Sequence, residues 1–263
     1  MTGNEPRPVG FGRLVGRSVV ITGSGAGVGL GRSLAIGFAR AGADLTLNHV
    51  GEEPAVFEAF LQELRALGAR VGTVEGDISR EEVATALVDK AVRDHGGVDV
   101  LVNNAAVSEP AVTAAMSLAT WQRTIDVNLT GVFLATRAAL GPMLVQSRGR
   151  IISVASQIAL KGGREHSHYA AAKAGIIAFT KSVALEVAHH GITANTIAPG
   201  PLNTRLMANV SERWRRDKLA ELVIPRFGEP EEVVPTALLL ASDPAGNLYT
   251  GQTLGPNCGD VMP

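Results

Sequence analysis

The chain has 263 residues, of which 46% are hydrophobic and 19% charged, and its formal net charge at pH 7 is −1. This length allows one large α/β domain with a sizeable core, and the charge provides no field that would attract nucleic acid or an anionic membrane. Aromatic residues make up only 4% and there are 30 glycines, which favours close packing of helices on a sheet.

Hydrophobic periodicity predicts strands and helices that alternate along the chain. The predicted strands cover residues 18–22, 43–48, 70–75, 98–102, 150–154, 193–197 and 251–254. The predicted helices cover residues 28–41, 53–67, 81–95, 118–146, 168–189 and 231–241, and the pattern is loosest between Pro199 and the last helix. Such alternation predicts a single Rossmann-like, doubly wound parallel sheet with helices on both faces.

The ends of the chain and its single cysteine bear on location. Residues 1–12 are predicted to form a flexible tail, and residues 13–263 a single domain. The first residues, MTGNEPRPVGFGRLVGR, lack the apolar stretch of a secretory signal, and no run reaches the length of a membrane span. Cys258 has no partner for an intrachain disulfide, so a reducing cytoplasm is the expected location.

The sequence TGSGAGVGLG lies between the first predicted strand and the first predicted helix, where a helix N-terminus presents unpaired N–H groups to a pyrophosphate. The pattern G-x-G-x-x-G does not fit, but Thr-Gly-x-x-x-Gly-x-Gly does. On this spacing Gly23 permits the turn, Gly27 lets the backbone approach the phosphates, and Gly29 lets the helix lie close to the strand. Two glycines are not required by this spacing, Gly25 and Gly31. The alternative is a tight turn without a ligand.

If the glycine loop binds a dinucleotide coenzyme, the end of the second strand bears on whether this is NAD or NADP. An Asp or Glu there binds the 2′-hydroxyl of NAD and repels the 2′-phosphate of NADP. The chain has Asn48 and His49 at this position, and Asp44 lies too early in the strand. NADP is therefore preferred over NAD, although no arginine fork is evident and Ala26 stands where a basic residue could hold the phosphate.

Tyr169 and Lys173 are four residues apart on a predicted helix, so their side chains project from one face. A free phenol has a pKa of about 10. A nearby ammonium, together with a positive nicotinamide ring, would lower it, so Tyr169 is predicted to exchange a proton with a carbonyl or an alcohol. Ser156 follows a strand, and its hydroxyl would hold the substrate oxygen. Taken singly, Ser156, Tyr169 and Lys173 also fit structural roles. A hydride transferred directly from a nicotinamide coenzyme to the substrate needs no metal.

Seven motifs in chain order resemble the short-chain dehydrogenase/reductase family over about residues 15–255. They are Thr22-Gly-x-x-x-Gly-x-Gly29, Asp77 in GDIS, Asn103-Asn104-Ala105-Ala106, Asn128 in DVNLTG, Ser156, Tyr169-Ala-Ala-Ala-Lys173 and Pro199-Gly200. The resemblance implies an NAD(P)-dependent oxidoreductase that interconverts a secondary alcohol and a ketone, and it implies a homotetramer. It also implies that Asn128 anchors a water beside Lys173, and that Lys173 binds the nicotinamide ribose.

Coenzyme contacts are predicted along most of the chain. The residues are Gly23, Ser24, Gly27, Val28, Gly29, Asn48, His49, Asp77, Ile78, Asn104, Ala105, Ala106, Tyr169, Lys173, Pro199, Gly200, Leu202 and Thr204. Asp77 and Ile78 would flank the adenine, as the resemblance implies, or Asp77 would simply hold a turn. The catalytic set is Asn128, Ser156, Tyr169 and Lys173.

The chain departs from the family pattern near its C-terminus, where Pro256-Asn257-Cys258-Gly259 replaces Val-Asp-Gly-Gly, and this leaves the length of the last strand open. The 3-oxoacyl-acyl-carrier-protein reductases are the closest general resemblance. These reductases often carry a basic residue on which an acidic carrier protein docks. This chain has His189 and His190 at that position, and two largely neutral histidines make a weaker docking patch for such a carrier.

Substrate choice is expected to lie in Pro201–Phe227. The basic run Glu212–Lys218 either contacts a CoA or carrier-protein phosphate or is a solvated helix face, and Trp214 could face an apolar substrate. The leading function is an alcohol/ketone oxidoreductase acting on a small molecule. The alternatives are a 3-oxoacyl-carrier-protein or CoA reductase and a non-catalytic nucleotide sensor, and the intact catalytic set argues against the sensor.

Overall fold

The structure, a computed structural model, describes residues 14–204, 207 and 212–262, so the predicted tail lies outside the described residues. The strands are β1 (Ser18–Ile21), β2 (Asp44–His49), β3 (Val71–Glu75), β4 (Val100–Asn103), β5 (Gly149–Val154), β6 (Ile192–Ile197) and β7 (Thr253–Leu254). They form one sheet in the order β3-β2-β1-β4-β5-β6-β7, and every neighbouring pair is parallel. The predicted fold class is confirmed.

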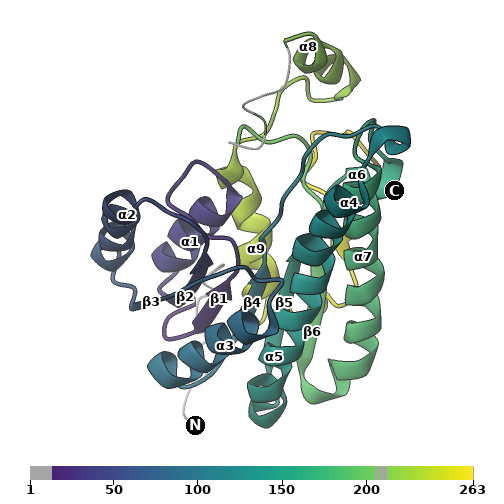
Figure 1. Ribbon diagram of the computed structural model, residues 1–263. Coiled ribbons are helices and arrows are strands. Elements are labelled where there is room, and N and C mark those ends of the chain that lie inside the picture. The colour runs from purple at the N-terminus through teal and green to yellow at the C-terminus, as the bar shows by residue number, and fades with distance from the viewer. Residues whose placement is uncertain (1–13, 205–206, 208–211, 263) are drawn as a thin grey trace.

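Helices connect the strands and cover the sheet. The helices are α1 (Leu30–Arg40), α2 (Pro54–Ala66), α3 (Glu81–His95), α4 (Leu118–Ile125), α5 (Gly131–Gln146), α6 (Ile158–Lys161), α7 (Ser167–Val187), α8 (Glu212–Glu221) and α9 (Val234–Ala241). In Figure 1, α3, α4, α5 and α7 cover one face of the sheet, and α1, α2 and α9 lie toward the other. The strand order reverses between β1 and β4, and ligands of such sheets bind at the carboxyl ends of the strands beside this point.

The core lies on both faces of the sheet because successive strand residues point in opposite directions. Val19 and Ile21 of β1 pack with α1, α2 and α9, whereas Val20 packs with α3, α5 and α7. All three side chains are fully buried. Strands buried on both faces read as continuous apolar runs, which is why short stretches such as SVVI could be recognised in the sequence.

Local sequence signals define several helix ends. Glu53 caps α2 by accepting hydrogen bonds from two backbone N–H groups, and Pro54 occupies the first helical position, where no N–H is needed. Helix α3 ends at Gly96, whose φ of 84° is the left-handed conformation that glycine tolerates. These boundaries agree with the predicted ones to within one residue.

The predicted helix 118–146 is continuous but contains a π-helical turn, Asp126–Thr130, between α4 and α5. The whole segment is long and apolar enough to cross a membrane by length and composition, yet half of its most apolar window is buried within the protein. It contacts α3 and α7, so its apolar character is explained by packing in the core.

Two helices and the last strand differ from the sequence prediction. Helix α6 was not predicted, α8 was expected only as one reading of the run Glu212–Lys218, and β7 has two residues where four were expected. The α8 sequence, ERWRRDKLAE, has no apolar stripe that periodicity could detect. In Figure 1 this helix projects away from the sheet, where it needs no broad apolar face.

Candidate active site

The glycine loop connects β1 to α1 and is closed at both ends by contacts that leave no room for side chains. Gly23 has a φ of +65°, and a Cβ there would lie 2.5 Å from the Cα of Ala105. A Cβ at Gly31 would lie 2.2 Å from the carbonyl oxygen of Gly23. The buried hydroxyl of Ser24 donates to the carbonyl of Gly31 at 3.0 Å. This cradle at a helix N-terminus fits a pyrophosphate group.

The assignment of the packing glycine to Gly29 was wrong. A Cβ at Gly29 would meet only one atom, the carbonyl oxygen of Gly27, at 4.0 Å. Gly31 is the residue that lets α1 approach β1, although the spacing argument left it without a role. The helix begins at Leu30, directly after the Thr-Gly-x-x-x-Gly-x-Gly motif, and the close contact falls on the second residue of the helix.

The polar groups of the Asn48 side chain are already engaged by the protein. The Asn48 side chain is 1% exposed, accepts from the N–H of Gly23 at 3.3 Å and donates to the carbonyls of Val74 and Gly76 at 3.3 and 2.8 Å. The His49 ring lies 3.9 Å from that of Phe57, centre to centre, and burial lowers the pKa of His49. The Asn48 amide therefore holds β2 to β3 and to the glycine loop, and the coenzyme contact of His49 stays a prediction.

An acid missed by the sequence argument lies against the glycine loop. The Glu52 carboxylate accepts a hydrogen bond from the N–H of Ala26 at 3.1 Å. A Cβ at Gly25 would lie 2.0 Å from the same carboxylate, so a side chain there would displace the end of the Glu52 side chain. Glu52 stands three residues beyond β2 rather than at its last residue. The expected spacing of about 20 residues after the glycines was a signal that could have identified it.

The loop after β4 is fastened to the glycine loop. The Thr22 hydroxyl accepts from the N–H groups of Asn104 and Ala105 at 3.0 and 3.1 Å. The Asn104 amide in turn donates to the carbonyls of Thr22 and Gly23 at 3.0 and 2.9 Å. Ala106 follows in the same partly exposed loop. Residues predicted to line the coenzyme are thus brought together at the switch point of the sheet.

Asp77 and Ile78 lie at the carboxyl end of β3. The Asp77 carboxylate accepts from the N–H and hydroxyl of Ser79 at 3.0 and 2.7 Å and forms an ion pair with Arg123 of α4. Burial opposes ionisation of Asp77, but the bonds from Ser79 and Arg123 outweigh it and lower its pKa. Ile78 is 3% exposed and belongs to the core. The Asp77 side chain therefore holds a turn, which was the structural alternative.

Tyr169, Lys173 and Ser156 meet where β5 ends and α7 begins. The Lys173 side chain is 1% exposed, and its Nζ lies 5.5 Å from the centre of the Tyr169 ring. This amine donates to the carbonyl of Val154 at 2.6 Å. The Ser156 hydroxyl accepts from the N–H of Ile158 at 3.3 Å, and its interaction with the phenol acts to lower the pKa of Tyr169. Tyr169 and Lys173 thus project from the same face of α7, as predicted.

The two central ionisable groups have shifted pKa values. Burial raises the pKa of Tyr169 to about 12, and the hydrogen bond with Ser156 acts in the opposite direction. Burial lowers the pKa of Lys173 to about 7. The helical spacing predicts that Lys173 lowers the pKa of Tyr169, but Lys173 alone does not do so. Burial of the pair disfavours both the ammonium of Lys173 and the phenolate of Tyr169. Tyr169 is protonated at neutral pH, the form that donates a proton to a carbonyl oxygen.

Asn128 lies in the π-helical turn and is fully buried. Its side chain accepts from the N–H of Val107 and donates to the carbonyl of Val107, both at 2.8 Å. The amide thus ties the long helix to the loop after β4, and its role in anchoring a water stays a prediction. A π-helical turn changes the direction of backbone carbonyls, and such turns are frequent at functional sites.

The segment after β6 lies against the C-terminal residues. Gly200 donates its N–H to the carbonyl of Pro256 at 3.2 Å, and a Cβ at Gly200 would lie 2.8 Å from the Cα of Asn257. Pro199 accepts from the N–H of Gln157, the residue after Ser156. Leu202 forms an isolated bridge with Gly228, and Thr204 donates its N–H to the carbonyl of Leu202 at 2.8 Å. The first part of this segment, at Pro199, therefore lies close to Ser156.

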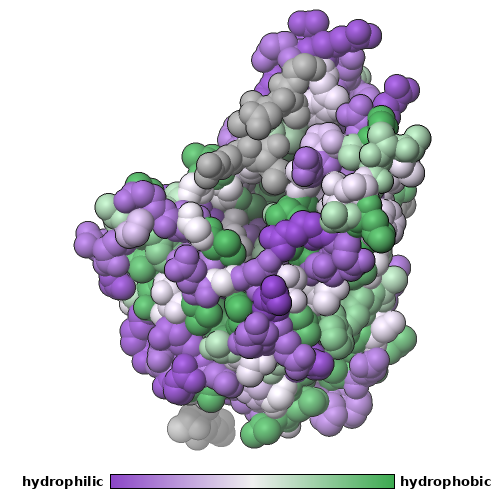
Figure 2. All heavy atoms as spheres, in the orientation of Figure 1, coloured by the Kyte–Doolittle hydropathy of each residue, from purple (hydrophilic) through white to green (hydrophobic). Residues whose placement is uncertain are grey.

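Figure 2 shows the molecule hollowed below the α8 projection, with hydrophobic side chains visible in the recess. A separate cavity of about 430 Å³ lies at the opposite edge of the sheet, where its lining includes Arg17, Arg148 and Arg150. Arg17 and Arg148 pair with Asp99 at 3.0 and 2.9 Å, and Arg150 donates to Asn247 at 2.6 Å. None of the predicted site residues lines this cavity.

A family model described as short chain dehydrogenase matches residues 17–215. The chain belongs to the short-chain dehydrogenase family. It is an NAD(P)-dependent oxidoreductase that acts on CH–OH and ketone groups. The family assignment, the Rossmann-like fold and the oxidoreductase activity expected from the sequence are confirmed.

Relatives of this dehydrogenase cover nearly its whole length. A 3-oxoacyl-[acyl-carrier-protein] reductase of Synechocystis sp. is 37% identical over 91% of this chain and 95% of its own. The (2S)-[(R)-hydroxy(phenyl)methyl]succinyl-CoA dehydrogenase subunit BbsD of Thauera aromatica is 35% identical over 90% of this chain and 94% of its own. The crystal structure of gox2181 superimposes with a TM-score of 0.89 at 30% identity and covers 95% of this chain and 97% of its own.

His168, Trp214 and the two histidines before β6 also have defined surroundings in this dehydrogenase. His168 is fully buried and its Nε2 bonds with the carbonyl of Glu109 at 3.0 Å. Trp214 packs against Phe227, with ring centres 6.2 Å apart. His189 and His190 lie just before β6, at the amino end of the strand. The candidate active site lies at the opposite, carboxyl edge of the sheet. A carrier protein docked on these histidines would therefore not lie at the entrance of the candidate site.

Proposed function

We propose that Tyr169 exchanges the proton with the substrate oxygen, that Ser156 holds this oxygen, and that Lys173 and Asn128 support the tyrosine. The observation that carries this proposal is the contact of Ser156 with Tyr169 at the carboxyl edge of β5, with Lys173 buried beneath the ring. A phenol with a raised pKa is protonated at neutral pH, as carbonyl reduction requires. A bound nicotinamide coenzyme supplies the hydride, and its oxidised ring supplies a positive charge that favours the phenolate.

For the substrate class we propose a 3-oxoacyl or 3-hydroxyacyl thioester, which is narrower than the general alcohol/ketone reaction. Both relatives named above carry acyl-carrier or CoA substrates in their names. Arg213 and Arg216 are exposed on α8, where they are available to an anionic carrier or a CoA phosphate. This supports an electrostatic contact at α8 rather than at the histidines before β6.

The test measures kcat/KM for acetoacetyl-CoA and for simple ketones of similar size, each with NADH and NADPH. The thioester is expected to be the better substrate by at least about tenfold, since its carrier adds contacts outside the reacting carbonyl. Turnover of simple ketones without turnover of the thioester would contradict the substrate class and leave the alcohol/ketone reaction intact. An absence of turnover with every carbonyl would contradict the proposed catalytic roles.

For the coenzyme, we propose NAD rather than the NADP that the end of β2 suggested. The Glu52 carboxylate at the glycine loop supports NAD, because a 2′-phosphate brought near it would meet a like charge. The nearby guanidinium of Arg32 is already bonded to the carbonyl of Ala26 at 3.2 Å and to Glu63 at 2.5 Å. It therefore offers no free fork for the phosphate.

Glu52→Gln tests the coenzyme proposal. The variant is expected to bind NADPH at least about tenfold more tightly and NADH almost unchanged, because only the like-charge repulsion is removed. Titration of protein fluorescence with each reduced coenzyme gives both dissociation constants. Glu53→Gln is the matched control, since that neighbouring carboxylate caps α2 instead. Tighter binding of NADPH than of NADH by the unaltered protein would contradict the proposal.

We further propose that residues 13–263 act as one domain, in the cytoplasm, and as a homotetramer. Large apolar side chains exposed on α5 and α7 support association of copies, among them Phe133, Val145 and Leu185, which are 41%, 89% and 85% exposed. Light scattering tests this assembly, and a monomer at micromolar concentration would contradict it.

A further inference from the structure

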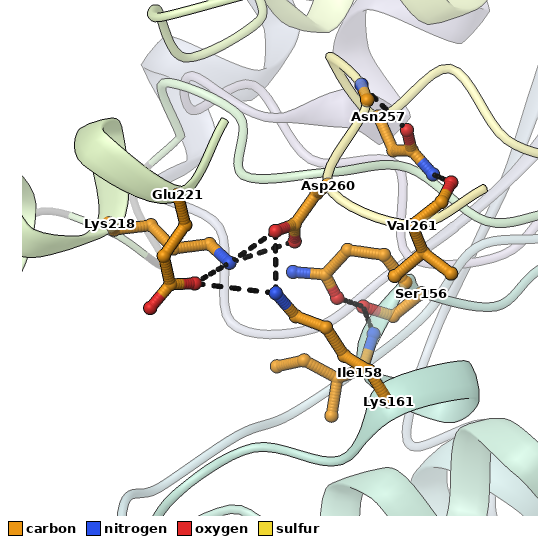
Figure 3. Close-up of polar contacts among 10 residues, drawn as sticks. Ser156, Ile158, Lys161, Lys218, Glu221, Asn257, Asp260 and Val261 are labelled. Atoms are coloured by element: carbon orange, nitrogen blue, oxygen red, sulfur yellow. Dashed lines mark hydrogen bonds and ion pairs between the residues drawn. The ribbon is translucent and has the colours of Figure 1, made fainter. Parts of the chain in front are cut away.

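The last described residues form a compact turn, Pro256–Val261, which we call the C-terminal hook. Asn257 shapes it, because its side chain is 5% exposed, donates to the carbonyl of Val261 at 2.9 Å and accepts from the N–H of Gly259 at 3.0 Å (Figure 3). The hook lies directly against Gly200, where no side chain would fit. This is the segment that departs from the family pattern in the sequence.

The hook places Asp260 at the centre of a charged cluster. The Asp260 side chain is completely buried, and its carboxylate lies 2.7 and 2.8 Å from Nζ of Lys218 and 2.5 Å from Nζ of Lys161. Glu221 accepts from the same two amines at 3.0 and 3.3 Å (Figure 3). Burial opposes ionisation of Asp260, but the two ammonium groups outweigh it and lower its pKa. One buried carboxylate therefore joins α6 to α8.

Backbone contacts reinforce the link between the hook and α8. Ile224, just after the helix, donates its N–H to the carbonyl of Cys258 at 3.0 Å. Gly259 has a φ of +75°, and a Cβ there would lie 2.6 Å from Cβ of Val223. The chain following α8 thus rests directly on the hook.

The cluster stands beside the catalytic serine. Helix α6 begins two residues after Ser156, and the Ser156 hydroxyl accepts the N–H of Ile158, its first residue. Figure 3 shows the cluster and Ser156 in one view. Helix α8 comes from the segment in which substrate choice is expected, and Figure 1 shows it projecting above the body of the protein.

We propose that Asp260 is a positioning residue that clamps α8 to α6 and thereby sets the shape of the substrate site beside Ser156. The inference rests on the proposed function only in assuming that the substrate binds between these elements. Removing the carboxylate leaves two ammonium groups facing each other with Glu221 alone between them. Loss of one partner from a buried ionic cluster leaves charge uncompensated, so α8 is expected to move away.

Asp260→Asn removes the charge and keeps the shape. The variant is expected to raise KM about tenfold while kcat changes less than about twofold, because substrate positioning is lost and proton transfer is not. Lys218→Met is expected to do the same, and the double variant no more than either alone. Asp217→Asn is the matched control on α8, since Asp217 is exposed and its ion pair with Arg213 is long, at 3.8 Å.

A second readout does not depend on turnover. The chain has two tryptophans, so in a Trp121→Phe background the fluorescence anisotropy of Trp214 reports the motion of α8. Anisotropy is expected to fall in Asp260→Asn and in Lys218→Met, with NADH affinity and thermal unfolding near those of the background protein. The control at Asp217 is expected to keep it unchanged.

Unchanged anisotropy and unchanged KM in both variants would overturn the clamp, even in an active enzyme. Equal loss of kcat and of NADH affinity would also overturn it, since that pattern indicates general damage. Lowered anisotropy in a protein that turns over no carbonyl substrate would support the clamp and would count against the proposed function alone.

Discussion

Gly31→Ala and Gly29→Ala form a matched pair that tests the structure of the glycine loop. At Gly31 the new methyl group would lie 2.2 Å from the carbonyl oxygen of Gly23 and 2.7 Å from the Asn104 amide nitrogen. The first contact is with backbone, which cannot rotate away. Overpacking costs about 1–3 kcal/mol and losing the hydrogen bond between Asn104 and Gly23 about 1 kcal/mol more, so we expect a loss of about 2–4 kcal/mol of unfolding free energy.

At Gly29 the same methyl group meets nothing closer than 4.0 Å, and its φ of 177° is extended backbone that alanine adopts. The expected loss is below about 1 kcal/mol, mainly because alanine is a weaker N-cap. Urea unfolding of both variants without coenzyme, at equal protein concentration, measures the difference. If Gly29→Ala were the more damaging change, or if the two were equal, the assignment of Gly31 as the packing glycine would be refuted.

The remaining predictions concern the catalytic pair. Tyr169→Phe keeps the ring and removes the hydroxyl, so turnover in steady-state kinetics should fall by about 10²–10⁴-fold. The dissociation constant for NADH, measured by fluorescence titration, should stay within about twofold. Near-normal turnover would remove Tyr169 from the mechanism. Lys173 has a folded pKa of about 7, below its ordinary value of 10.5, so between these values the unfolded chain binds a proton that the folded chain does not, and stability rises with pH. Wild type should therefore gain stability relative to Lys173→Met from pH 7 to 10, by up to about 1.4 kcal/mol per pH unit, and a pH-independent difference in urea unfolding would contradict the shift.

The sequence by itself determined the fold class and the family of this dehydrogenase, and it predicted the candidate catalytic set. Strands buried on both faces leave continuous apolar runs, and helices leave a repeat near 3.6 residues, so the order of elements can be read locally. The four-residue separation of Tyr169 and Lys173 likewise depends only on helical geometry. These features follow from short-range rules that hold wherever the segment lies.

Only the tertiary structure decided which side chains were free to act. Asn48 was read as a ribose ligand, but its amide is used by backbone groups of β3 and the glycine loop, whereas Glu52, from beyond the strand, reaches that loop. Asp260 meets Lys161 and Lys218 across separations of 99 and 42 residues. Burial also raises the pKa of Tyr169, whereas the spacing of Tyr169 and Lys173 alone predicted a lowered pKa. Contacts between distant segments, and the removal of water that accompanies them, leave no periodic trace in the sequence.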